Sequence, residues 1–298
     1  MTAPDMRARF VETGTALLRA DRRLALVLAD IGAAQFRDAG APAERVFNVG
    51  IREQAMIGVA AGLAFVGLRP IVHTIASFAV ERTYEQLKID LGHQDVGAIV
   101  VTHGASYDYS ASGRTHHAPE DVALVSSLPG WEVYVPGHPD EVTDILTRAA
   151  SAEGRVYVRL SLQQNATAHG QGVIRDGTRG TVIAVGPVLD RVLEATAGLD
   201  VAVLYLTAVR PLDVALDSAR TRTPNIILVE PYQEGTSSAH VAAAFVDVPH
   251  RLLAIGVKNI EHRSYGTPAD HDRAHGLDVA SLRQRIAGFL EVPRPERG

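Results

Sequence analysis

Short apolar runs alternate with longer stretches of helical periodicity along this chain, and this alternation restricts the possible folds more than any other feature. The runs are long enough only for strands, and the segments between them have apolar residues three and four positions apart. Such alternation is typical of βαβ units and predicts an α/β fold with mostly parallel sheets. In the first half, we expect strands at Leu24 to Leu28, Pro70 to His73, Ala98 to Thr102, Glu132 to Val135 and Arg155 to Leu160, and helices around Gln54 to Leu63, Tyr84 to Leu91 and Asp140 to Ala150.

A polar, glycine-rich segment from Gln163 to Gly180 interrupts this pattern and is the best candidate for a linker. The alternation then resumes over a length that suits a second domain. We therefore expect two domains, residues 1–168 and residues 169–298, each with a mostly parallel sheet flanked by helices. In the second, we expect strands near Val173 and at Thr181 to Val185, Val201 to Tyr205, Asn225 to Val229 and Arg251 to Ile255, and helices at Val188 to Ala197, Ser237 to Phe245 and Val279 to Leu290.

Composition and charge exclude several classes of protein. The 298 residues include no cysteine, which excludes disulfide frameworks, thiolate metal sites and cysteine nucleophiles. With 29 basic and 34 acidic side chains the formal net charge is -5, so we expect no nucleic-acid partner. The N-terminus has no apolar signal segment and the apolar runs are strand-sized, so we expect a cytoplasmic protein without membrane contact.

The stretch from Asn48 to Ala64 is a glycine turn followed by a helix of small residues, with Glu53 in its first turn. Glycine inside a helix costs about 1 kcal/mol relative to alanine, so close approach of another helix or a ligand is the physical reason to tolerate Gly58 and Gly62. An isolated glutamate here would be explained by the helix dipole. The whole block, however, resembles the pyrimidine-binding domain of transketolases and deoxyxylulose-phosphate synthases. The resemblance implies that Glu53 is the catalytic glutamate that contacts thiamine diphosphate.

The resemblance extends in register through the segment from Gly67 to Gln86. It implies that Phe78 and Tyr84 line the pocket for the aminopyrimidine ring of the cofactor. Burial in the core is the alternative explanation for both aromatic side chains. Transketolases often have another stacking aromatic at position 81, where this chain has Glu81, and this departure leaves the details of the pocket open.

The segment from Ala29 to Gly32, after the first predicted strand, is similar to a loop whose apolar residue supports the bent form of the cofactor. The resemblance implies that Ile31 is that residue and that Asp30 is its neighbour in the cofactor site. A plain turn at the end of a strand is equally consistent with these four residues.

Three histidines lie in the glycine-containing loop after the strand that ends at Thr102: His103, His116 and His117. They could be imidazole ligands of a metal, but no carboxylate lies at a familiar ligand spacing. The resemblance implies instead that His103 and His116 face the carbonyl and hydroxyl groups of the substrate, since a histidine can donate or accept a proton near neutral pH. His117 replaces the glutamine usual in the family and is a further candidate for substrate binding.

Two departures from the family concern the substrate. Sugar-phosphate transketolases have an aspartate a few residues before the Thr-His pair, where this chain has Ser112. Their phosphate-binding arginine at the end of the domain is also missing from Leu160 to Asn165, although Arg159 lies just before this stretch. Arg114 and Arg7 are the remaining candidates for binding an anion. These departures favour a substrate other than the pentose-pathway sugar phosphates.

The diphosphate-binding motif of this superfamily, Gly-Asp-Gly followed by Asn, is absent from the sequence. That motif supplies oxygen ligands for Mg²⁺, so the resemblance places the magnesium ligands on another polypeptide and none on this chain. The chain also begins where the second domain of a full transketolase begins. We therefore expect an N-terminal, diphosphate-binding partner subunit and an α2β2 heterotetramer.

The sequence thus predicts the C-terminal subunit of a split transketolase-like enzyme. Such an enzyme would transfer a two-carbon ketol or acyl unit from a ketose or a 2-oxo acid to an acceptor, with thiamine diphosphate as cofactor. Two alternatives remain. One is the β subunit of the decarboxylase component of a 2-oxo acid dehydrogenase, which shares the fold and the glutamate. The other is a non-catalytic interaction subunit that keeps only the scaffold.

Overall fold

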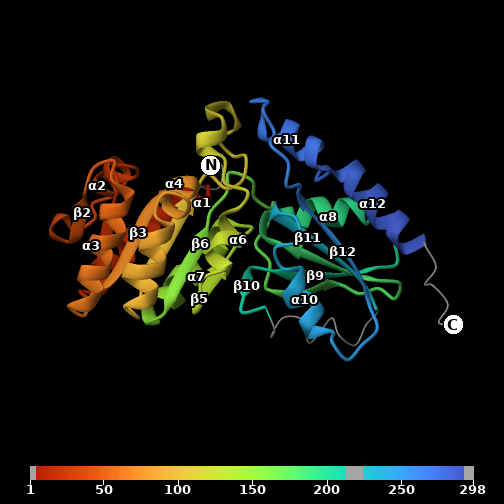
Figure 1. The fold of residues 1–298 in the computed structure, drawn as a ribbon, viewed down its shortest axis with the longest axis horizontal. Helices are drawn as coiled ribbons and strands as arrows, with labels where there is room; N and C mark the ends of the chain where they lie inside the picture. The colour runs from red at the N-terminus through yellow and green to blue at the C-terminus, as the bar shows by residue number, and fades with distance from the viewer. Residues whose placement is uncertain (1–4, 213–223, 292–298) are drawn as a thin grey trace.

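The computed structural model of the protein describes residues 5–212 and 224–291, which form two sheets covered by helices (Figure 1). The elements of the first half are α1 Met6–Ala20, β1 Leu24–Leu28, α2 Ala33–Asp38, η1 Ala43–Arg45, β2 Val46–Asn48, α3 Glu53–Phe65, β3 Arg69–Ile75, α4 Ala76–Val80, α5 Tyr84–Gln86, η2 Leu87–His93, β4 Ile99–His103, η3 Ser110–Ser112, η4 Arg114–His116, α6 Asp121–Ser126, β5 Trp131–Tyr134, α7 Pro139–Ser151 and β6 Arg155–Arg159. Those of the second half are β7 Gly172–Arg175, β8 Thr181–Val185, η5 Gly186–Val188, α8 Leu189–Ala195, β9 Ala202–Leu206, β10 Ala208–Arg210, β11 Asn225–Gln233, α10 Ser238–Ala244, β12 Arg251–Val257, α11 Pro268–His275 and α12 Val279–Glu291.

The first sheet is built around β1, β3 and β4, whose residues are buried along their whole length. Its described strands lie in the order β10-β5-β6-β4-β3-β1-β2, and they are parallel except for β10, which pairs antiparallel with β5. Strands buried on both faces consist of continuous apolar residues, which is why the strand at Leu24–Leu28 could be recognised in the sequence.

The second sheet has the order β12-β11-β8-β9-β7 in the described residues. It is parallel except for β7, the short strand near Val173, which pairs antiparallel with β9. The helices α8 and α12 pack against each other on one side of this sheet (Figure 1). Both sheets therefore confirm the predicted α/β class with mostly parallel strands.

The first helix, α1, was not among the predicted elements. The side chain of Asp5 caps it by accepting a hydrogen bond from the Ala8 amide at 2.7 Å. Its inner face buries Met6, Phe10 and Leu18 completely. Charged residues interrupt these apolar positions in the sequence, so the helical period is visible only once the buried face is known.

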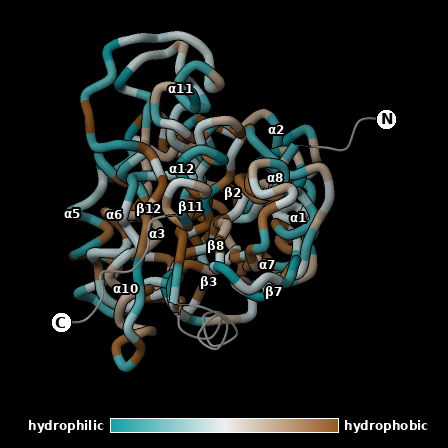
Figure 2. Tube along the Cα trace, turned by 90° about the vertical axis from the view of Figure 1, so that its right-hand side faces the viewer, coloured by the Kyte–Doolittle hydropathy of each residue, from teal (hydrophilic) through white to brown (hydrophobic). Residues whose placement is uncertain are grey.

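The two sheets share part of their hydrophobic core. One cluster of buried side chains includes Val133 of β5 and Leu228 of β11, which belong to different sheets. In Figure 2 the apolar stretches, drawn in brown, gather in the interior around β3 and β8, while polar stretches predominate outside. Among the described residues, no helix combines the length and the apolar character needed to span a bilayer.

Candidate functional site

Three of the predicted site segments follow the carboxyl ends of neighbouring strands. Asp30 and Ile31 follow β1, Phe78 lies on α4 directly after β3, and His103 is the last residue of β4. Since β1, β3 and β4 are adjacent and parallel, these ends meet at one edge of the sheet. This edge is the usual position of ligands in open α/β folds.

Glu53 is the first residue of α3, and its side chain is only 3% exposed. The Nη1 atom of Arg82 lies 3.4 Å from both oxygens of this carboxylate. The amino end of a helix also favours a negative charge at this place. Glu53 is therefore a buried carboxylate whose described ion-pair partner is a 42% exposed arginine.

Phe78 lies beside this ion pair. The guanidinium carbon of Arg82 is 3.7 Å from the centroid of the Phe78 ring. The ring of His116 approaches Phe78 edge-on, with the centroids 5.0 Å apart. Arg82 thus joins Glu53 to Phe78, and Phe78 in turn joins His116 to this group. It was not predicted as a site residue, because no local pattern links it to a glutamate 29 positions earlier.

His103 is buried and stacks on His73 of β3, with ring centroids 4.9 Å apart. Tyr109 lies edge-on to His103 at 5.7 Å and is 6.5 Å from His116, so it bridges the two predicted site histidines. Burial, followed by the influence of His73 and Arg7, lowers the pKa of His103 to about 2. Burial lowers the pKa of His73 to about 3. Both imidazoles are therefore neutral near neutral pH.

The loop after β1 packs against the same histidines. Asp30 has a positive φ of 68°, and its amide donates to the side-chain oxygen of Asn48 at 2.9 Å, which ties the loop to the turn before α3. A Cβ atom at Gly32, whose φ is 89°, would lie 3.0 Å from the His73 ring. Because of this contact and the left-handed backbone, a residue with a side chain would be strained there. Ile31, between them, is half-buried at this edge.

Tyr84 has its described polar contact elsewhere. Its hydroxyl forms a 2.6 Å hydrogen bond with the side chain of Ser127. Its ring lines a surface pocket together with Lys88, His93 and Leu128. The structure therefore joins Glu53 and Phe78 through Arg82 but shows no such link for Tyr84.

His117 points away from its neighbour His116, toward the second half of the chain. Its Nε2 lies 3.2 Å from the Ser110 carbonyl, and its ring lies 4.8 Å from Tyr107 and 5.5 Å from His271 of α11. Across residues 5–212 and 224–291, no three His, Cys, Asp or Glu side chains are arranged to hold a metal ion. The histidines of this loop therefore lie in two different places: His103 and His116 near Tyr109, and His117 near Tyr107 and His271.

The three remaining predicted residues differ in their surroundings. Arg114 donates to Glu120 at 2.8 Å and lies 3.6 Å from Glu261, so carboxylates already balance its charge. Ser112 is exposed on the turn η3. Arg7 projects from α1 near the site: after burial and His73 it contributes to the lowered pKa of His103, and it partly opposes the rise that burial causes in the pKa of Tyr109. Among these, Arg7 is the one associated with the histidine pair.

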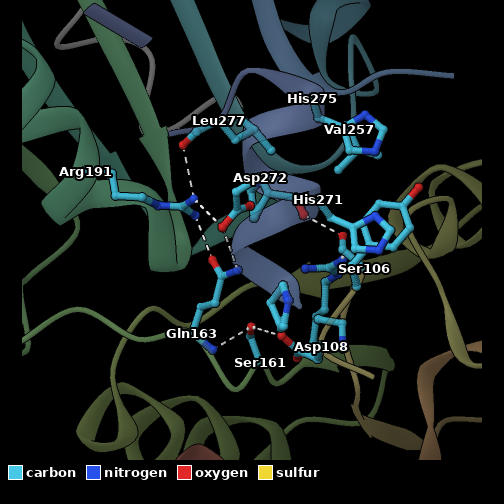
Figure 3. Close-up of a pocket in the computed structure, with 15 residues that line it drawn as sticks. Ser106, Asp108, Ser161, Gln163, Arg191, Val257, His271, Asp272, His275 and Leu277 are labelled. Atoms are coloured by element: carbon cyan, nitrogen blue, oxygen red, sulfur yellow. Dashed lines mark hydrogen bonds and ion pairs between the residues drawn. The ribbon is translucent and has the colours of Figure 1, made fainter. Parts of the chain in front are cut away.

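A small polar pocket lies where the two halves meet, between the loop after β4 and α11 (Figure 3). Arg191 lies 2.9 Å from the carboxylate of Asp272 and donates to Gln163 at 2.7 Å, and Gln163 donates to Asp272 at 3.0 Å. Nearby, Ser161 donates to Asp108 at 3.1 Å, and burial raises the pKa of Asp108 to about 6. The contacts of Gln163 with Arg191 and Asp272 connect the two halves, whereas the hydrogen bond between Ser161 and Asp108 lies within the first half.

Arg159, next to the stretch where the family has a phosphate clamp, is used within the protein. Its Nε donates to both oxygens of Asp121, at 3.0 and 2.8 Å, and both side chains are almost completely buried. Tyr157 donates to the same carboxylate at 2.7 Å, and Arg159 donates to Ser106 at 2.7 Å. This guanidinium is not directed at the Glu53 group.

The chain is similar to proteins of known family. A family model for the transketolase pyrimidine-binding domain matches residues 2–166. The chain is 50% identical over 296 residues to an "uncharacterized 33.6 kDa protein in fasciation locus" of Rhodococcoides fascians, covering 96% of this chain and 95% of that protein. It is 27% identical over 259 residues to one of the subunits of apulose-4-phosphate transketolase from Actinobacillus succinogenes, covering 80% of this chain and 83% of that subunit. A solved structure, described as a split gene transketolase in an inactive beta4 tetramer, superposes with a TM-score of 0.82 at 25% identity, covering 97% of this chain and 99% of that one.

Proposed function

The chain belongs to the transketolase pyrimidine-binding-domain family, and from this premise we propose that it is the catalytic, C-terminal subunit of a split thiamine-diphosphate-dependent enzyme. The enzyme transfers a two-carbon ketol or acyl unit to an acceptor. The observation that supports this proposal most strongly is the buried carboxylate of Glu53, grouped with the ring of Phe78 at the ligand-binding edge of a parallel sheet.

The residues at this edge suit an aminopyrimidine. A flat ring can stack on Phe78 while the Glu53 carboxylate accepts a hydrogen bond from the ring N–H of the imino tautomer and so favours that tautomer. Ile31 offers a half-buried apolar side chain after the adjacent strand β1. When bound, thiamine diphosphate supplies the reactive thiazolium carbon that adds to a substrate carbonyl. The part of Glu53 is to hold and orient the ring.

His103 and His116 act on substrate oxygens in this proposal. Because the pKa of His103 is about 2, its ring works as a neutral hydrogen-bond partner. His116 is more accessible, and its Nδ1 lies 3.0 Å from the hydroxyl of Thr115, which orients the ring beside Phe78. A neutral buried histidine and a more accessible one can divide the tasks of positioning an oxygen and moving its proton.

A partner subunit completes the site in this proposal. The diphosphate and Mg²⁺ need oxygen ligands from a Gly-Asp-Gly motif, which this sequence lacks. Toward the carboxyl end of α3, no described residue covers Gly62: a Cβ there would meet nothing within 4 Å, and Phe65 and the following Val66 are 60% and 75% exposed. Small and apolar residues left uncovered along α3 favour contact with another chain. We therefore propose an α2β2 assembly in which two diphosphate-binding subunits supply the magnesium ligands.

The solved relative that consists of beta subunits alone is described as inactive. By analogy, we propose that the present chain turns over no substrate without its partner. We also propose that residues 1–168 form the pyrimidine-binding domain and that residues 169–298 form the C-terminal domain.

In this proposal, the stretch from Leu160 to Asn165 does not bind a phosphate group of the substrate. Arg159 is committed to Asp121, and Arg114 is balanced by Glu120 and Glu261. Arg7 and Ser112 remain as groups for an anionic or hydroxyl-bearing substrate. The donor is a ketose or a 2-oxo acid.

Reconstitution tests the proposed function. The chain is combined with a diphosphate-binding partner, thiamine diphosphate and Mg²⁺, and ketol transfer to aldehyde acceptors is measured beside acyl transfer to a lipoyl group. We expect ketol transfer by the wild type and a loss of at least about 100-fold in Glu53→Gln, with the fold retained. Acyl-lipoyl formation instead would assign the chain to a 2-oxo acid dehydrogenase. Full activity of Glu53→Gln, or no activity in any combination, would contradict the proposal.

A further inference from the structure

The guanidinium of Arg82 is a flat, positively charged group that contacts both Phe78 and Glu53. Its guanidinium carbon lies 3.7 Å from the centroid of the Phe78 ring, and its Nη1 lies 3.4 Å from both carboxylate oxygens of Glu53. A guanidinium is planar and donates N–H groups. In its flat shape and in the N–H group that faces the carboxylate, it therefore resembles the imino tautomer of an aminopyrimidine that stacks on Phe78 and donates to Glu53.

We infer that Arg82 occupies the pyrimidine position of the cofactor site and must leave it when the cofactor binds. This inference rests on the proposed function, because it assumes that Phe78 and Glu53 receive the aminopyrimidine. Two flat groups cannot both lie on the same face of Phe78 at stacking distance. The arginine and the cofactor therefore exclude each other from this place.

The backbone around Arg82 is fixed, so the movement is confined to its side chain. Gln54 of α3 donates to the Arg82 carbonyl at 3.0 Å, and the Thr83 hydroxyl donates to the Ala79 carbonyl. The side chain itself is 42% exposed, and its contact with Glu53, at 3.4 Å, is longer than the 2.7–2.9 Å of a strong charge-assisted hydrogen bond. It can rotate into solvent without disturbing the fold.

In the cofactor-free chain, the contact between Arg82 and Glu53 stabilises the fold. A buried carboxylate without a partner is strongly destabilising, and Arg82 is the described cation beside Glu53. Arg82 thus stabilises the free subunit while it lowers the affinity for the cofactor. Removal of its side chain should change stability and cofactor binding in opposite directions, whereas a purely structural residue would weaken both.

Calorimetric titration of the chain, assembled with its diphosphate-binding partner, with thiamine diphosphate and Mg²⁺ tests the inference. Arg82→Ala should bind about 3- to 30-fold more tightly than wild type, the range expected from loss of one competing cation–π contact. Arg82→Lys, which keeps the charge but not the flat guanidinium, should lie between them. Arg37→Ala, which removes a 75% exposed arginine on α2, is the matched control and should bind like wild type.

Thermal unfolding of the same variants provides the second readout, and Arg82→Ala should unfold at a lower temperature than wild type. Equal, weaker or undetectable cofactor binding by folded Arg82→Ala would overturn the inference. Glu53→Ala in the Arg82→Ala background separates this result from the proposed function. If the double variant still binds the cofactor as well as Arg82→Ala does, the proposed cofactor site is wrong. If the double variant loses binding, and Arg82→Ala alone binds no better than wild type, only the role of Arg82 is wrong.

Discussion

The imidazole rings of His73 and His103 lie face to face on adjacent strands, 4.9 Å apart and 30° from parallel. The Nδ1 of His73 donates to the Val101 carbonyl at 2.8 Å, since a carbonyl can only accept, and this fixes the tautomer of a completely buried ring. His73 therefore provides a neutral, immobile surface on which His103 rests.

This pair predicts an acid-sensitive fold. The pKa of His73 is about 3 in the folded chain and about 6.5 when unfolded. The unfolded chain binds the proton first as the pH falls below 6.5, so stability is lost from there toward pH 3. When the pH falls from 7.5 to 5, the free energy of unfolding should decrease in wild type by roughly 2 kcal/mol more than in His73→Phe. Urea unfolding followed by circular dichroism at both pH values measures this, and equal losses would contradict it.

The buried carboxyl group of Glu230 predicts the opposite pH dependence of stability, with stability lost as the pH rises. Burial raises the pKa of this carboxyl to about 7, although it accepts a hydrogen bond from the Ser237 amide at 3.1 Å. A raised carboxyl pKa favours the folded chain below the unfolded value, and this contribution is lost as the pH rises through 7. At pH 8, Glu230→Gln should be more stable than wild type by about 1–3 kcal/mol. Glu44→Gln, at a 74% exposed side chain, is the control and should change nothing measurable in urea unfolding.

The ion pair of Arg159 and Asp121 predicts a large loss of stability. Asp121→Asn should cost about 3–5 kcal/mol, because it leaves a buried guanidinium without its counter-charge. Asp95→Asn, which removes the counter-charge of Arg155 at an 89% exposed side chain, should cost less than about 1 kcal/mol. Chemical unfolding of both variants provides the comparison. Similar losses in the two would show that burial of the pair is unimportant.

Two aromatic substitutions separate the predicted cofactor contacts. In the reconstituted enzyme, Phe78→Ala should raise the dissociation constant for thiamine diphosphate about 10-fold, because a stacking surface is lost. Tyr84→Phe removes only the hydrogen bond to Ser127 and should leave the dissociation constant within about twofold of wild type. Titration by intrinsic fluorescence measures both. A strong effect of Tyr84→Phe would place that hydroxyl in the cofactor site instead.

Much of the fold could be predicted because buried parallel strands are apolar throughout. The predicted strand from Leu24 to Leu28 and the one from Thr181 to Val185 have the bounds seen in the structure. The helix α1 was missed because its charged residues mask the apolar period, and the three-residue strand β10 is too short for a periodic signal.

The site could be predicted only as far as its residues follow strands. Glu53, Phe78 and His103 were predicted because their segments resemble a known family, and the topology brings their elements to one edge. The contacts of Arg82 depend on side-chain conformations that no spacing encodes, and so does the stacking of His73. Their roles in binding stay predictions until the variants are measured.

The strand β10 has a consequence for how the chain can be divided. Residues Ala208–Arg210 return from the second half to pair with β5 of the first sheet, so they cover an edge that residues 1–168 would leave open. Open sheet edges recruit other strands and promote aggregation. A fragment expressed up to residue 168 would therefore precipitate or dimerise through β5, and a gene encoding a soluble first half would have to continue past residue 210.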